Sequence, residues 1–142
     1  MKATTWLRVA AVLTLVHAVL HTIGGVFGKP DPGAAAAAYA AMTANHFPAL
    51  GQTRSYAEFY RGMGLAVTIF LTAESVVLWL LAGLVRTSGA RLRPVLATFA
   101  VAYVAMAVNS QMYFFAAPVI TELLIAACLV GAVVTAPKAA EA

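Results

Sequence analysis

Residues 61–86 read RGMGLAVTIFLTAESVVLWLLAGLVR, and this stretch decides the class of the fold. Twenty-four residues separate its two arginines, and Glu74 is the only charged residue among them. A helix that spans a bilayer needs about 20 apolar residues, so the stretch is long enough to cross a membrane. A carboxylate near the bilayer centre costs on the order of 2.5–3.5 kcal/mol, so Glu74 is also the first candidate functional residue.

The whole chain has the same apolar character. It has 142 residues, of which 63% are hydrophobic and 10% are charged, whereas a soluble domain carries about 25% charged residues. We therefore expect a single integral membrane domain over residues 1–142, surrounded by lipid. The basic residues form no patch interleaved with aromatics, which argues against nucleic-acid binding. Cys128 is the only cysteine, so a dithiol redox pair within the chain is excluded.

Charged residues and one proline divide the chain into four predicted spans, at about 6–27, 57–85, 93–115 and 118–136. Pro118 follows two alanines and is expected to end the third span and open the fourth. The long loop between the first two spans contains the alanine-rich stretch 34–45, which predicts a short helix. The expected fold is an all-α four-helix transmembrane bundle.

The distribution of basic residues predicts the orientation of these spans. Both termini and the 86–93 loop would share one side of the membrane, and the other two loops would share the opposite side. The first side carries Lys2, Arg8, Arg86, Arg91, Arg93 and Lys138, and the second carries Lys29, Arg54 and Arg61. The excess predicts that both termini face the cytoplasm and that the short helix is extracytoplasmic. Abundant alanine and arginine suggest a bacterial inner membrane.

The first predicted span carries two histidines, His17 and His21, which are four residues apart and share one helix face. Gly24 and Gly28 continue this face and would allow a neighbouring helix to approach closely. Two histidines at this spacing can chelate a metal, but the spacing alone predicts neither a metal nor another cofactor. The structural alternative is a pair of buried histidines that form hydrogen bonds across helices.

Several polar residues are expected at one depth, in the outer third of the membrane. They are His21, Arg61, Asn109, Gln111, Tyr113 and Glu122. Glu74 and His17 would lie deeper. This match in depth predicts a polar pocket that opens to the outer side. Buried carboxylates beside imidazoles would suit acid–base chemistry there. Glu122 or Glu74 would be the acid or base, with His17 or His21 as its partner.

The remaining predicted ligand-binding residues are Arg61, Asn109, Gln111 and Tyr113, which would orient a polar group of the ligand. Arg54 and Glu58 precede Arg61 at helical spacing, and we expect them to form an interfacial salt bridge. Glu74 falls on roughly the opposite helix face from Arg61. A central pocket would therefore be off-centre, or one of the two residues would face a partner protein.

Two segments carry a resemblance to a known group of proteins. One is His17-x-x-x-His21-x-x-Gly24-Gly25, and the other is RSYAEFYRGMG at residues 54–64. The chain resembles small bacterial four-helix inner-membrane proteins of unknown function, and this resemblance implies four spans. It is similar to sterol-isomerase-like membrane proteins only in pairing intramembrane carboxylates with histidine, since their motifs do not match residue by residue.

We expect the protein to bind a lipophilic small molecule, and an isomerase, cyclase or hydratase acting by proton transfer is the catalytic form of this hypothesis. Two alternatives stay open. One is a non-catalytic accessory subunit, in which Glu74 would contact a partner membrane protein. The other is a proton or ion pathway, which would require the chain to form a homo-oligomer.

Overall fold

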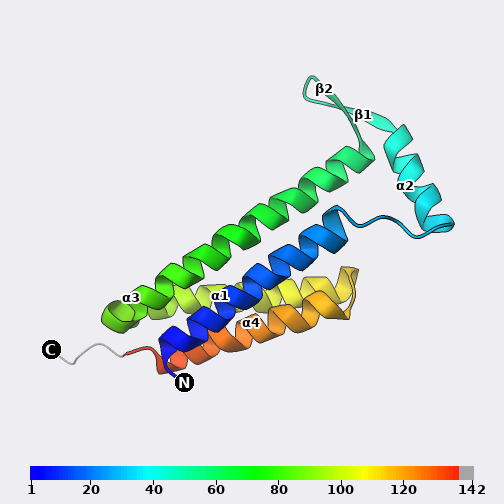
Figure 1. Cartoon of the computed structure of the whole chain (residues 1–142). Coiled ribbons are helices and arrows are strands. Elements are labelled where there is room, and N and C mark those ends of the chain that lie inside the picture. The colour runs from blue at the N-terminus through cyan, green and yellow to red at the C-terminus, as the bar shows by residue number, and fades with distance from the viewer. Residues whose placement is uncertain (138–142) are drawn as a thin grey trace. The chain divides into compact units, whose positions relative to one another are not determined.

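The computed structural model describes residues 1–137, and the described chain is mostly helical (Figure 1). Its elements are α1 (Ala3–Leu20), a π-helix η1 (His21–Val26), α2 (Ala34–Ala44), β1 (His46–Ala49), β2 (Gln52–Ser55), α3 (Tyr56–Tyr113) and α4 (Ala116–Thr135). The all-α class and the short helix expected at 34–45 are confirmed. Lys138, which contributed to the predicted charge asymmetry, lies outside the described residues.

Three helical stretches are long and apolar enough to cross a membrane: Ala3–Val26, Tyr56–Tyr113 and Ala116–Thr135. Only 22–33% of the most apolar part of each is buried inside the protein. Helices that are apolar around their whole circumference are typical of chains whose outer surface contacts lipid. These helices therefore indicate a membrane protein.

The longest of these helices is divided in two by a kink. Ser88 has non-helical angles, with φ −126° and ψ 23°, and it separates a first arm of α3 (56–87) from a second arm (89–113). The Tyr103 hydroxyl donates a hydrogen bond of 3.1 Å to Oε2 of Glu74. In a straight helix these residues would be about 44 Å apart, so the second arm must run back along the first.

The reversal falls within the segment 86–93, where a loop was predicted, but its form differs from a loop. The backbone there is helical except at Ser88, so the turn is much tighter than expected. Arg93, expected in the loop, donates instead to the carbonyl oxygens of Val134 and Ala136 near the end of α4. A cation at the carboxyl end of a helix satisfies carbonyls that have no partner within the helix.

The chain forms two compact units, and each is described separately. The first combines Met1–His17 with the chain from Leu71 onward, and the second is Ala18–Phe70. The first unit contains most of α1, the later part of α3, and α4. Its core is built from leucines and alanines spaced three or four residues apart, so each helix buries one stripe. The largest fully buried side chain is Tyr103.

The second unit contains a β-hairpin that the sequence analysis did not predict. Strands β1 and β2 pair antiparallel, with His46 opposite Ser55 and Ala49 opposite Gln52. The connecting residues, Leu50 and Gly51, both have positive φ, at 44° and 83°, as in the two-residue turns that match the twist of paired strands. His46-Phe47-Pro48, which follows the alanine-rich helix, therefore begins a strand.

The helical end of the first predicted span also differs from expectation. Residues 21–26 form a π-helix, in which the Phe27 amide donates to the Thr22 carbonyl five residues back. The wider turn ends the face on which Gly24 and Gly28 were expected to pack, and both glycines are exposed. The close approach occurs instead at Gly64, where a Cβ would lie 2.9 Å from the Val26 side chain.

Packing in the first unit generates a prediction about Gly131. A Cβ placed there would lie 2.8 Å from the ring of Trp6, whereas a Cβ at Gly83 would meet nothing within 4 Å. We expect Gly131→Ala to destabilise the protein by about 1–3 kcal/mol, because a rigid indole ring must move. Gly83→Ala is the matched control and should be neutral or slightly stabilising. Unfolding by SDS in mixed micelles measures both, and equal effects would contradict the packing argument.

Candidate functional site

The first unit contains a buried chain of polar side chains centred on Tyr103. The phenol is fully buried, and its hydroxyl donates to Glu74. The same hydroxyl lies 3.1 Å from the Thr14 hydroxyl, which in turn donates to the Ala10 carbonyl at 3.0 Å. One tyrosine on the second arm of α3 therefore connects the first arm to α1.

A second hydrogen bond joins the same two helices beside Glu74. The Ser75 hydroxyl is buried and donates to the Ala11 carbonyl at 2.8 Å. Ala10 and Ala11 are small enough for α3 to approach the backbone of α1 at this point. The close contact between α3 and α1 at Ser75 therefore fixes the position of the neighbouring Glu74.

Glu122 is the most buried acidic residue among residues 1–137, with 2% of its surface exposed. Its Oε1 accepts a 3.0 Å hydrogen bond from the Ser110 hydroxyl, while its Oε2 is buried and has no hydrogen-bond partner among the described residues. A buried carboxylate oxygen without a donor is unfavourable and calls for an explanation, since buried polar atoms are nearly always paired.

The two carboxylates belong to one polar seam. Tyr103 and Ser110 are seven residues apart on the buried face of the second arm, which is two helical turns or about 10 Å. Glu74 is bonded to the first of these residues and Glu122 to the second. We call the set Thr14, Glu74, Tyr103, Ser110 and Glu122 the buried polar seam; Glu74 is half-buried and the other four are buried.

The two histidines are placed in different units. His17 is buried in the first unit, one turn beyond Thr14 on α1. His21 lies in the second unit, where its Nε2 is 3.1 Å from the Gly64 carbonyl. The neighbouring Thr22 hydroxyl is 2.9 Å from that of Thr68, so this part of η1 is joined to α3 by two polar contacts.

The predicted ligand-binding residues are also divided. Asn109, Gln111 and Tyr113 are exposed at the end of the second arm. Of the polar run at 109–111 only Ser110 is buried, because it continues the face that carries Tyr103. Arg61 lies in the second unit, and its guanidinium donates a 2.9 Å hydrogen bond to the Tyr39 hydroxyl. Whether these residues bind a ligand stays a prediction.

Glu58 has a structural role that differs from the expected salt bridge with Arg54. Its Oε2 accepts hydrogen bonds from the Ser55 amide at 2.7 Å and the Ser55 hydroxyl at 3.1 Å, and Ser55 Oγ accepts one from the Glu58 amide. This reciprocal pair is a capping box, which satisfies amide groups at the start of α3. The spacing Ser55-x-x-Glu58 was the available signal.

Sequence reasoning missed Tyr103, the residue that organises the seam. The signal was its position in the middle of a long apolar stretch, where a phenol hydroxyl must find a partner within the protein. Thr14 and Ser110 were visible in the sequence as polar neighbours of other candidates. Their partners depend on which helices pack together, and a single sequence does not contain that information.

Among residues 1–137, no group of three His, Cys, Asp or Glu side chains lies close enough to hold a metal ion. The chain matches no protein-family model, and no similar protein was found among curated proteins or solved structures.

The seam predicts a specific role for the Tyr103 hydroxyl. Tyr103→Phe removes the contacts to both Thr14 and Glu74 while keeping the ring, so we expect a loss of about 1–2 kcal/mol in the free energy of unfolding. Tyr113→Phe is the matched control, because Tyr113 is 71% exposed, and it should change stability by less than about 0.5 kcal/mol. SDS titration of both variants checks this, and an unchanged Tyr103→Phe protein would show that the hydroxyl does not hold the helices together.

Proposed function

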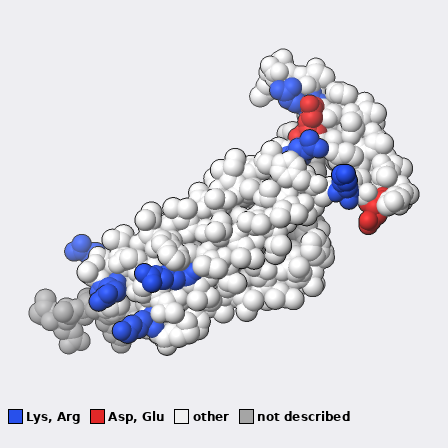
Figure 2. All heavy atoms as spheres, viewed as in Figure 1, with Lys and Arg blue, Asp and Glu red and all other residues white. Residues whose placement is uncertain are grey.

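We propose that the chain is a four-span bacterial inner-membrane protein whose termini face the cytoplasm. The kink at Ser88 supports four spans, because it divides the longest apolar helix into two antiparallel arms. Charge supports the orientation: Lys2, Arg8 and Arg86 lie around one hollow at the end of the first unit, and Figure 2 shows basic side chains gathered there. An excess of basic residues marks the cytoplasmic side.

We infer that the buried polar seam binds a lipophilic small molecule through a polar group. The observation that carries this proposal is Oε2 of Glu122, which is buried without a hydrogen-bond donor. A hydroxyl or amide on an otherwise apolar ligand would supply that donor and remove the cost of the unpaired oxygen. The apolar surroundings of the seam suit the remainder of such a molecule.

The chain through Tyr103 also suits proton transfer. Three close contacts join the Ala10 carbonyl, Thr14, Tyr103 and Glu74, but the two hydroxyls supply only two protons. A proton delivered to Glu74 would complete the set of hydrogen bonds, and a proton withdrawn would reopen it. Such an arrangement supports an isomerase, cyclase or hydratase in which Glu74 or Glu122 exchanges a proton with the bound molecule, with His17 as a further candidate.

One observation favours the alternative of an accessory subunit. Asn109 and Gln111 are exposed beside the buried Ser110, and amide side chains on the outside of an apolar helix can form hydrogen bonds with a partner membrane protein. In that case the exposed face of the second arm would be the interface, and the seam would serve packing alone. Co-purification of a stoichiometric partner would support this function.

The binding proposal predicts the behaviour of Glu122 variants. The protein is extracted gently from its own membranes, and native mass spectrometry measures the small molecule that it retains. We expect Glu122→Gln to lower retention at least about tenfold, because an amide N–H₂ would replace the oxygen that accepts the ligand's donor. Glu58→Gln is the matched control, since glutamine also serves in a capping box.

A second variant separates binding from stability. Glu122→Leu should fold, because leucine fits an apolar site. It should retain none of the molecule, because the substitution removes the carboxylate. A Glu122→Leu protein that is clearly more stable and retains the molecule fully would contradict the proposal. A wild-type protein that carries no small molecule but holds a partner chain would favour the accessory-subunit alternative.

A further inference from the structure

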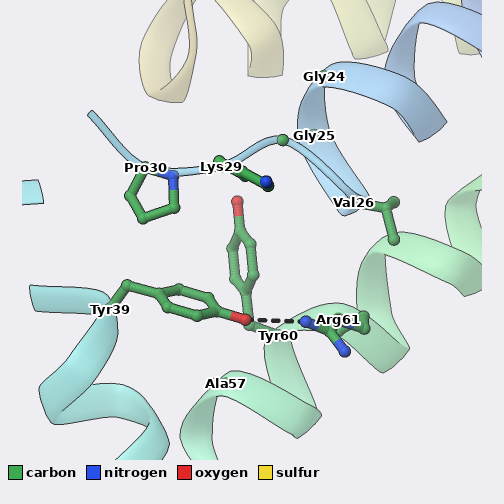
Figure 3. Close-up of a pocket in the computed structure, with 10 residues that line it drawn as sticks. Gly24, Gly25, Val26, Lys29, Pro30, Tyr39, Ala57, Tyr60 and Arg61 are labelled. Atoms are coloured by element: carbon green, nitrogen blue, oxygen red, sulfur yellow. Dashed lines mark hydrogen bonds between the residues drawn. The ribbon is translucent and has the colours of Figure 1, made fainter. Parts of the chain in front are cut away.

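The second unit contains a pocket that is separate from the buried polar seam. It has a volume of about 240 Å³ and is lined by three parts of this unit: η1 with the residues that follow it, α2, and the first turns of α3 (Figure 3). Lys29 and Arg61 are its charged lining residues, and its lining includes no acidic residue. A concave site that holds two cations without an acid is suited to an anion.

Arg61 is positioned for this role by a neighbouring tyrosine. Its guanidinium donates to the Tyr39 hydroxyl at 2.9 Å, as the dashed line in Figure 3 shows, and this contact uses one nitrogen of the group. A guanidinium has five N–H donors in a fixed plane, so others stay available for a second acceptor. Tyr60 also lines the pocket, and Figure 3 shows its hydroxyl on the side of Lys29.

The nearest acidic residue along α3 is already engaged elsewhere. Glu58 uses its carboxylate in the capping box, where it accepts hydrogen bonds from the Ser55 amide and hydroxyl. It therefore does not neutralise Arg61. The lining of the pocket therefore contains no counter-charge for Arg61 and Lys29.

Lys29 also has a possible structural role at the end of a helix. It lies three residues after the end of η1 at Val26, and a cation near the carboxyl end of a helix offsets the partial negative charge of free carbonyl groups. That role explains a lysine at position 29 without a ligand. It does not explain why Arg61, near the opposite end of a different helix, lines the same pocket.

The size and surroundings of the pocket narrow the chemistry of its ligand. Its volume is below the roughly 300–1,000 Å³ of sites that enclose a whole small molecule, so it suits a compact charged group. Four aromatic side chains of this unit, Phe27, Tyr56, Phe59 and Tyr60, are more than half exposed. Exposed aromatic residues at helix ends are typical of the membrane–water interface, where lipid headgroups lie.

We propose that this pocket binds a phosphate group with a net negative charge, held by Arg61 and Lys29. The planar guanidinium can donate two parallel hydrogen bonds to phosphate oxygens, and the lysine adds a point charge. The phosphate can belong to an anionic lipid headgroup or to a soluble ion. The proposal does not depend on the seam, because none of its residues lines this pocket.

The test uses the full chain purified in a neutral detergent. Native mass spectrometry measures retained phosphatidylglycerol. Phosphatidylcholine is the comparison lipid, because its choline cation cancels the charge of its phosphate. We expect Arg61→Gln and Lys29→Gln each to lower retention of phosphatidylglycerol about tenfold or more. Arg54→Gln is the matched control, because it removes the same charge from an exposed residue of β2 that does not line the pocket and whose hydrogen bonds go to its hairpin neighbours Thr53 and Gln52.

A second experiment identifies the source of the phosphate. Inorganic phosphate at millimolar concentration is added during thermal unfolding and during lipid binding. Stabilisation together with displacement of phosphatidylglycerol would support a site that a soluble phosphate can enter. Retention of phosphatidylglycerol without an effect of inorganic phosphate would support a lipid headgroup as the source.

Two results would overturn the proposal: equal losses in Arg61→Gln and Arg54→Gln, or equal retention of phosphatidylglycerol and phosphatidylcholine by the wild-type protein. If Arg61→Gln fails to fold, Lys29→Gln still decides the matter, because Lys29 lies outside the helices. Arg61→Lys should then restore folding and an intermediate retention, since it keeps the charge and loses the planar donor pair.

Discussion

A polar side chain inside an apolar helix bundle has no water to bond to, so it must find its partner on a neighbouring helix. The structure of the first unit depends on this constraint. Tyr103 satisfies Glu74 and Thr14 at once, and Ser75 satisfies a backbone carbonyl of α1. Apolar contacts between such helices have little directional preference. These few hydrogen bonds therefore fix which faces meet and at what height.

In the proposed function, the few polar residues of the seam combine structural and chemical roles. Ser110 holds one oxygen of Glu122 in place and leaves the other in a buried position. A carboxylate with hydrogen bonds to both oxygens would be rigid but would have no oxygen left for a ligand, while one with no hydrogen bonds would be mobile. In Glu122 one oxygen is held by a hydrogen bond and the other has none, so the acid would be both positioned and able to react.

The long apolar helices could be predicted from the sequence because hydropathy and charge are local properties. The boundary near Pro118 was also predictable, and α4 begins at Ala116 with the proline in its first turn, where no helical hydrogen bond is lost. Both intramembrane carboxylates were identified for the same reason. Their cost in an apolar environment can be judged without knowing their neighbours.

The features that could not be predicted depend on partners or on turn geometry. Tyr103 matters because of two residues outside its own arm of α3: Glu74 on the first arm and Thr14 on α1, which is 89 positions away in the sequence. The π-helix at residues 21–26 and the hairpin turn at Leu50-Gly51 arise from backbone angles that composition signals weakly. The capping box was the exception, since its pattern stood in the sequence and was interpreted as a salt bridge.

The kink at Ser88 has a consequence for biosynthesis. Glu74 is translated 29 residues before Tyr103, so the first arm of α3 leaves the ribosome with a carboxylate that lacks its hydrogen-bond donor. Releasing this arm alone into lipid would expose the acid, whereas releasing both arms together as a helical hairpin would deliver it already paired. The absence of a loop at Ser88 keeps the two arms adjacent during that step. Under the proposed four-span topology, the order of synthesis and the hydrogen bond therefore favour insertion of α3 as one unit.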